Sequence, residues 1–160
     1  NAMETMLVDG KIAKKFLPGM IKRYKAAGVA LKVCAKTLKI DKSLTAAKEE
    51  EYYNEYLEKV MNIKIVKDMD TAMDHIAQYG SAHSDAIVTK DYEKAMRFLR
   101  EVDSSAVFVN ASTRLNDGFQ FGLGAEMGIS TDKIHARGPM GLEELTCLKF
   151  IVYGSGQLRV

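Results

Sequence analysis

The stretch NIKIVKDMDTAMDHIAQYGSAHSDAIVTKDYEKAMRFLREVDSSAVFVN, residues 62–110, decides the fold class. It contains three short apolar segments, NIKIVKD, DAIVT and AVFVN, which have the length and the β-branched content of buried strands. The two segments between them are long enough for helices and carry helical signals. The stretch therefore predicts the order strand, helix, strand, helix, strand.

Both helices are predicted from their caps and their spacing. Asp68 or Asp70 can cap the first, Gly80 can end it, and Asp91 can cap the second. In the second helix the apolar residues recur at i, i+3, i+4 and i+7, namely at Ala95, Phe98, Leu99 and Val102. Because helical crossovers of this length join parallel strands, we expect a three-layer α/β/α sandwich with a mainly parallel sheet.

The flanking segments continue the alternation. TMLVD and VALKVC are predicted strands, and a helix is expected from Lys11 to a C-terminal stop at Gly28, with Pro18 as a candidate kink. Its apolar face is expected to hold Ile12, Phe16, Met20, Ile21 and Tyr24. A partly helical segment is predicted within residues 49–60, a short helix at 141–147, and an extended strand or arm at the end of the chain.

Composition excludes several classes of protein. The 160 residues are 47% hydrophobic and 28% charged, as in a single soluble domain. The 23 basic residues are interleaved with 21 acidic ones, so the net charge of +2 indicates no nucleic-acid partner. No apolar run approaches the roughly 18 to 20 residues of a membrane span, and no signal-peptide pattern is seen. We therefore expect a cytoplasmic protein without a membrane partner.

Cysteines and histidines predict neither a metal site nor a disulfide framework. Cys34 and Cys147 lie far apart, and no metal-ligand spacing links the three histidines, which are His75, His83 and His135. Lys32 and Lys36 would favour a thiolate at Cys34. However, Cys34 closes an apolar run and has no base near it in sequence, so a packing role is the stronger interpretation.

A glycine-rich stretch, STRLNDGFQFGLGAEMGIS at residues 112–130, contains four of the 12 glycines. Its nearest match to a dinucleotide fingerprint, GLGAEMG, has the wrong spacing and begins twelve residues after the strand that ends at Asn110. A loop whose glycines allow close approach to a ligand is favoured over a nucleotide cradle, and a plain structural turn is the other alternative.

The segments YGSAHSDAIVT, VFVNASTRLNDGFQFGLGAEMGISTDKIHARGPMGLEEL and KFIVYGSGQLR resemble the C-terminal part of the γ-glutamyl phosphate reductase family. These glutamate-5-semialdehyde dehydrogenases are a divergent branch of the aldehyde dehydrogenase superfamily. The resemblance continues in order through METMLVDGKIAKKFLPGM, GVALKVCAKT and EYYNEYLEKVMNIKIVKDMDTAMDHI. It implies a fold like the aldehyde dehydrogenase catalytic domain.

The same resemblance implies a step of proline biosynthesis, the reduction of γ-glutamyl 5-phosphate to glutamate 5-semialdehyde and phosphate with NADPH. In the family a cysteine thiolate displaces phosphate to form a thioester, and hydride then releases the aldehyde. That cysteine would immediately precede Asn1, so no catalytic residue is assigned within the chain. Family members are much longer and begin with a Rossmann-type NADPH-binding domain. Asn1 and Ala2 are either native or the remnant of an expression tag before Met3.

Site residues are implied by position. Glu55 matches a glutamate that hydrogen-bonds a cofactor ribose, and the loop at residues 121–128 stands where the superfamily closes over the substrate. By charge complementarity, Arg114 would pair with the substrate carboxylate and Glu126 or Asp117 with its ammonium group. Glycines that allow close backbone approach, with an aromatic neighbour, complete the predicted substrate site: Phe121, Gly122 and Gly124.

Two function classes follow from this resemblance. Residues 1–147 are expected to be a catalytic-domain portion, and residues 148–160 an oligomerisation arm of a homo-oligomer. The first class is therefore part of an NADPH-dependent reductase. The second is a catalytically silent substrate-binding or assembly module, because a chain without its nucleophile and Rossmann domain is expected to be inactive in isolation.

Overall fold

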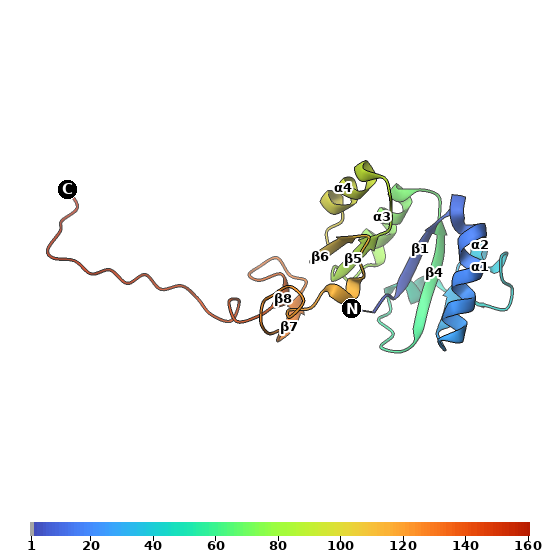
Figure 1. The fold of residues 1–160 in the computed structure, drawn as a ribbon, viewed down its shortest axis with the longest axis horizontal. Helices are drawn as coiled ribbons and strands as arrows, with labels where there is room; N and C mark the ends of the chain where they lie inside the picture. The colour runs from blue at the N-terminus through green and yellow to red at the C-terminus, as the bar shows by residue number, and fades with distance from the viewer. Residues whose placement is uncertain (1) are drawn as a thin grey trace.

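The computed structural model describes residues 2–160, and a four-stranded parallel sheet forms its centre. The sheet order is β1-β4-β2-β3 (Figure 1). The strands are β1 (Thr5–Asp9), β2 (Ala30–Val33), β3 (Thr45–Ala46) and β4 (Val60–Val66). In the register, Thr5 lies opposite Asn62 and Ala30 opposite Val60. The predicted parallel sheet is confirmed.

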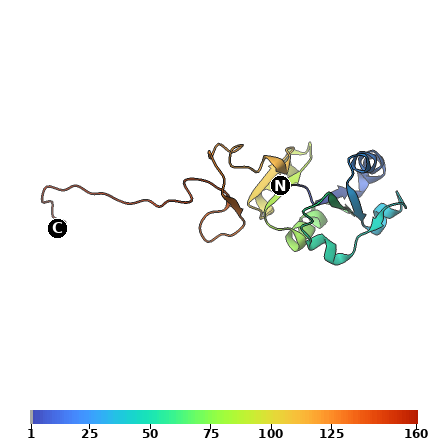
Figure 2. The ribbon, with the colours of Figure 1, turned by 90° about the horizontal axis from the view of Figure 1, so that it is seen from below.

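The side chains of β4 alternate between two covered faces of this sheet. Met61 and Ile63 face α1 (Gly10–Ala26) and form the main core with its residues Ala13, Leu17 and Ile21. On the other face, Asn62 and Lys64 contact η1 (Glu49–Tyr53) and α3 (Met69–Tyr79). Figure 2 shows α1 and α3 on opposite sides of the sheet. The layered α/β architecture is confirmed.

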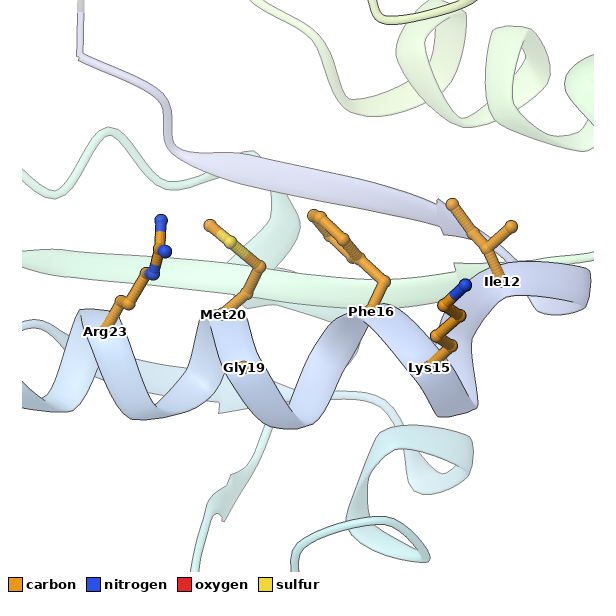
Figure 3. A pocket seen from close by; sticks show the side chains of 6 residues that line it. All are labelled: Ile12, Lys15, Phe16, Gly19, Met20 and Arg23. Atoms are coloured by element: carbon orange, nitrogen blue, oxygen red, sulfur yellow. The ribbon is translucent and has the colours of Figure 1, made fainter.

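Helix α1 differs from its prediction in the stripe that it buries. Ala13 and Leu17 lie in the core with Ile21, whereas Ile12 is 53% exposed and Phe16 is 38% exposed (Figure 3). A helix that packs on one sheet buries a single stripe, and the neighbouring stripe then faces outward. The expectation that Ile12, Phe16 and Met20 belong to the core-facing side was therefore wrong.

Aspartate side chains cap the N-termini of α3 and α4, as predicted. The Asp68 carboxylate accepts a hydrogen bond from the backbone N–H of Thr71 at the start of α3, and Gly80 ends that helix. Of the two candidates, Asp70 pairs instead with Arg97. Asp91 accepts from the Lys94 N–H at the start of α4 (Tyr92–Glu101).

A second pair of parallel strands stands beside the first sheet. β5 (Ser84–Ile87) and β6 (Ala106–Val109) pair directly in parallel, and α4 connects them along the chain. Helix α3 packs against α4. We expected β4 and β5 to share one sheet. They do not pair, because β1 and β2 already hydrogen-bond to the two edges of β4.

The remaining elements are short. They are α2 (Ala35–Leu38), η2 (Thr113–Leu115), β7 (Gly128–Ser130) and β8 (Gly138–Met140), and the last two pair antiparallel. The helix predicted over residues 49–60 is limited to η1. That predicted at 141–147 is wrong: the segment forms turns, in which the Glu144 carboxylate accepts from the Gly141 N–H. Residues 148–160 extend away without a strand, confirming an extended arm (Figures 1 and 2).

Candidate functional site

The glycine-rich segment folds into a closed loop held by two carboxylates. Asp117 Oδ1 accepts from the backbone N–H groups of Phe119 and Gln120, at 2.9 and 3.1 Å. Glu126 Oε2 accepts from the Gly118 N–H at 2.8 Å and so ties the start of the loop to its end. These bonds give Asp117 and Glu126 a structural role in the loop, whereas their predicted contact with a substrate ammonium group stays a prediction.

Three positions of the loop require glycine, two because of their φ angle and one because of a close contact. Gly122 and Gly124 have φ angles of 78° and 77°, in the left-handed region that favours glycine. At Gly118 a Cβ would lie 2.6 Å from the Ala125 carbonyl oxygen, so no other residue fits without movement. Backbone geometry thus accounts for all three, and the structural-turn alternative holds at least for the shape of the loop.

Phe121 joins this loop to the second pair of strands. Its ring stacks on Phe108 of β6, with ring centroids 6.4 Å apart, and it remains 46% exposed. The loop therefore rests against β6 while presenting part of an aromatic face outward.

Arg114 lies in η2, which packs beside β5. The Ser112 hydroxyl accepts from the Arg114 backbone N–H and starts this short 3₁₀ turn. The side chain is exposed, and its guanidinium forms no ion pair with any of residues 2–160. A charge without a partner beside the loop is available to an anionic ligand.

His83 directly precedes β5 and was not among the predicted site residues. Its Nδ1 lies 2.9 Å from the Ser84 hydroxyl. Burial lowers the pKa of His83, while the nearby carboxylates of Glu126, Glu55 and Asp85 act to raise it. Glu55 and Glu126 thus lie near enough to His83 to influence it electrostatically. The available signal was the polar triplet His-Ser-Asp at the start of a predicted strand.

Glu55 follows η1 and lies near a second carboxyl group, that of Glu4. Burial raises the pKa of Glu4, and the negative charge of Glu55 raises it further. Glu55 is exposed and forms no ion pair within residues 2–160. Its carboxylate is therefore free to accept hydrogen bonds from ligand hydroxyls.

Cys34 lies outside this group of residues. It is half-buried in a cavity of about 350 Å³ at the carboxyl ends of β2 and β4, where Lys36, Lys64 and Lys67 also line the wall. Burial raises the pKa of the thiol, but hydrogen bonds from Thr37 and the Ile65 N–H outweigh it, and the pKa is lowered. None of the predicted site residues lines this cavity.

The remaining features of the described residues indicate no further candidate site. Cys147 is exposed, in the turns before the arm. Over residues 2–160, no three His, Cys, Asp or Glu side chains gather so that they could hold a metal ion. The same residues include no helix with the length and apolar character needed to cross a membrane. Asn1, next to which the family cysteine was expected, lies outside the described residues.

Comparison with known proteins identifies the family. No protein-family model matches the chain. A γ-glutamyl phosphate reductase from Thermodesulfovibrio yellowstonii is 72% identical over 159 residues, which cover 99% of this chain. The chain belongs to the γ-glutamyl phosphate reductase family. It spans 38% of the length of that relative.

Solved structures agree with this assignment. The crystal structure of a γ-glutamyl phosphate reductase from Thermotoga maritima matches 98% of the chain with a TM-score of 0.92 and 47% identity, and the match covers 38% of that enzyme. A propionaldehyde dehydrogenase from Clostridium phytofermentans, 15% identical, matches with a TM-score of 0.59 and shows a shared fold. The expected aldehyde dehydrogenase-like α/β fold is confirmed.

Proposed function

We propose that the chain is the C-terminal portion of an NADPH-dependent reductase that converts γ-glutamyl 5-phosphate to glutamate 5-semialdehyde and phosphate in proline biosynthesis. The 72% identity to a γ-glutamyl phosphate reductase over 159 residues carries this proposal. The whole enzyme would act in the cytoplasm, and residues 148–160 would serve as an oligomerisation arm.

In this role the loop of residues 117–126 and the η2 arginine hold the glutamyl end of the substrate. The unpaired Arg114 guanidinium can bind a carboxylate through two parallel hydrogen bonds. Glu126 uses one carboxylate oxygen on the Gly118 N–H, so its second oxygen can meet the substrate ammonium group. The part-exposed ring of Phe121 covers the aliphatic part of the substrate.

NADPH supplies the hydride when it is bound, and this chain offers one residue that fits it. The exposed Glu55 carboxylate, free of ion pairs within the described residues, can accept hydrogen bonds from ribose hydroxyl groups. The phosphates need another site, because the glycine-rich loop is closed by its own carboxylates rather than open at a long helix N-terminus.

Reconstitution tests this proposal. The 160-residue chain is mixed with a separately produced N-terminal portion of the enzyme that contains the nucleophilic cysteine, and NADP⁺ reduction is followed with glutamate 5-semialdehyde and phosphate. We expect activity from the mixture only. A matched N-terminal portion with serine in place of the cysteine should give none. Turnover by the 160-residue chain alone would refute the proposal that the N-terminal portion supplies the nucleophile.

The second candidate function, a silent binding or assembly module, is favoured by the positions of the two thiols. Cys34 faces a separate cavity and Cys147 precedes the arm, so neither shares the loop with Arg114. Binding of glutamate 5-semialdehyde to the isolated chain, without turnover, would be its expected behaviour. An NMR titration that perturbs the loop amides would detect this binding.

A further inference from the structure

Hydrogen bonds from the neighbouring strand fix the backbone at His83. The Ser105 hydroxyl and the Ala106 N–H both donate to the His83 carbonyl oxygen, and the second of these bonds continues the β5–β6 pairing. The Ser105 N–H donates to the carbonyl oxygen of Ala82, whose φ of 58° lies in the left-handed region that favours glycine. Such costly backbone positions gather at functional sites, where surrounding contacts hold them. The position of His83 is therefore set before a ligand binds.

The imidazole of His83 uses one ring nitrogen within the chain. Its Nδ1 lies 2.9 Å from the Ser84 hydroxyl, whereas Nε2 forms no hydrogen bond with any of residues 2–160. Because side chains alternate along a strand, those of His83 and Asp85 lie on the same face. The Ser104 hydroxyl donates to Asp85 Oδ2 at 2.6 Å and so holds this carboxylate in place. The arrangement leaves Nε2 to a ligand, with a fixed carboxylate two residues away.

His83 lies between the two parts of the proposed site. Glu126, proposed to meet the substrate ammonium group, and Glu55, proposed to bind the cofactor ribose, both act on it electrostatically. The charge of Glu55 also acts on Glu4, and in both ribbon views the residues before β1 lie beside β5 and η2 (Figures 1 and 2). The reacting acyl carbon must lie between the glutamyl end and the nicotinamide, next to the cysteine that is expected just before residue 1. His83 therefore lies on the side of the reacting group.

We infer that His83 carries the proton that the phosphate group needs when it leaves, an inference that rests on the proposed function. The cysteine thiol gives its proton to Nε2 of His83. The thiolate then forms the carbon–sulfur bond of the thioester while the carbon–oxygen bond to phosphate breaks, and the imidazolium passes the proton to that oxygen, which releases HPO₄²⁻. In reverse, HPO₄²⁻ attacks the thioester and gives its proton to Nε2 as the thiolate departs. No electrons are exchanged in this step.

The charges around His83 suit both halves of this transfer. Burial lowers the pKa of His83, which keeps the imidazole neutral and ready to accept the thiol proton. The carboxylates of Glu126, Glu55 and Asp85 oppose this effect and stabilise the imidazolium once it forms. The imidazolium in turn offsets part of their negative charge at the point where a phosphate dianion must enter.

The complete enzyme, in which this chain is continuous with its N-terminal portion, tests the inference at pH 9 with glutamate 5-semialdehyde and NADP⁺. At this pH the thiolate forms without a base, because an ordinary thiol has a pKa of about 8.5. Without phosphate, the first turnover then gives a burst of NADPH. His83→Gln should retain the burst, whereas its phosphate-dependent turnover should fall about a hundredfold. His135→Gln, which changes an exposed histidine of another loop, is the matched control and should keep both.

Imidazole added to the solution separates proton transfer from a structural role. It should restore part of the phosphate-dependent turnover of His83→Ala, where it can take the place of the lost ring, and should not raise that of Arg114→Ala. The inference is overturned if His83→Gln turns over as fast as His135→Gln, or if its burst and turnover fall together and imidazole restores neither in His83→Ala. An unsubstituted enzyme that gives no burst would instead overturn the proposed function, and with it the basis of this inference.

Discussion

The Nζ of Lys64 on β4 lies 3.0 Å from Nδ1 of His75 on α3, at a site where burial already disfavours a charged histidine. His75 is buried, and the rings of Tyr52 and Tyr79 lie against both members of the contact. Burial, and then the charge of Lys64, lower the pKa of His75 from 6.5 to about 4. The imidazole is therefore neutral and accepts a hydrogen bond from the ammonium group.

This pair predicts a loss of stability in mild acid. The unfolded chain takes up a proton on His75 below pH 6.5, whereas the folded chain does not until about pH 4. The free energy of unfolding should therefore fall as the pH drops through this window, by up to about 3 kcal/mol from this residue. Urea titrations at pH 7 and pH 4.5 measure the change. In His75→Gln the drop should be smaller, and an equal drop in both chains would contradict the assignment.

Leu17 and Ile12 lie on neighbouring stripes of α1 and should respond very differently to truncation. Leu17 is fully buried, so Leu17→Ala should cost about 2–5 kcal/mol through lost contacts and a cavity. Ile12 is 53% exposed, and Ile12→Ala should change the stability of the monomer by less than about 1 kcal/mol. Chemical denaturation at low protein concentration compares them. Equal costs would mean that α1 packs by the other stripe.

The Gly118 contact predicts a local effect on the loop. A Cβ at Gly118 would clash with the Ala125 carbonyl oxygen, so Gly118→Ala should raise the hydrogen-exchange rates of the loop amides and lower the activity of the reconstituted enzyme. Gly128→Ala is the control, because a Cβ at Gly128 meets nothing within 4 Å and its φ is ordinary. If the two variants behave alike, the clash does not govern the loop.

Arg114 should matter for the substrate and little for folding. In the reconstituted enzyme, removal of a paired charge in Arg114→Ala should lower kcat/KM by about ten- to a hundredfold. Arg114→Lys should recover part of the loss, because lysine keeps the charge without the planar fork. The melting temperature should not change, since Arg114 forms no ion pair within residues 2–160. Unchanged kinetics in Arg114→Ala would remove it from the site.

Sequence patterns were most informative where the structure depends on neighbouring residues. Asp68 and Asp91 cap their helices, and the strands of residues 62–110 form where their apolar runs lie. Patterns did not reveal which strands would pair, because the partners of β4, namely β1 and β2, come from distant parts of the chain. Nor could periodicity decide between two adjacent apolar stripes on α1.

The candidate site was harder to predict. The exposed Arg114 and the left-handed Gly122 and Gly124 lie where the family resemblance placed a loop. The carboxylates of Asp117 and Glu126 proved to hold that loop together, which their charge alone did not indicate. The electrostatic influence of Glu55 and Glu126 on His83 comes from distant parts of the chain, and no local sequence pattern indicates it.

The reconstitution assay tests the proposed function most directly. The 160-residue chain and the N-terminal portion with its cysteine are each assayed alone and then mixed, with glutamate 5-semialdehyde, phosphate and NADP⁺. We predict NADP⁺ reduction in the mixture, its strong decrease with Arg114→Ala, and none with either piece alone. Reduction by the 160-residue chain alone, or an inactive mixture in which the two pieces form a stable complex, would contradict the proposed function.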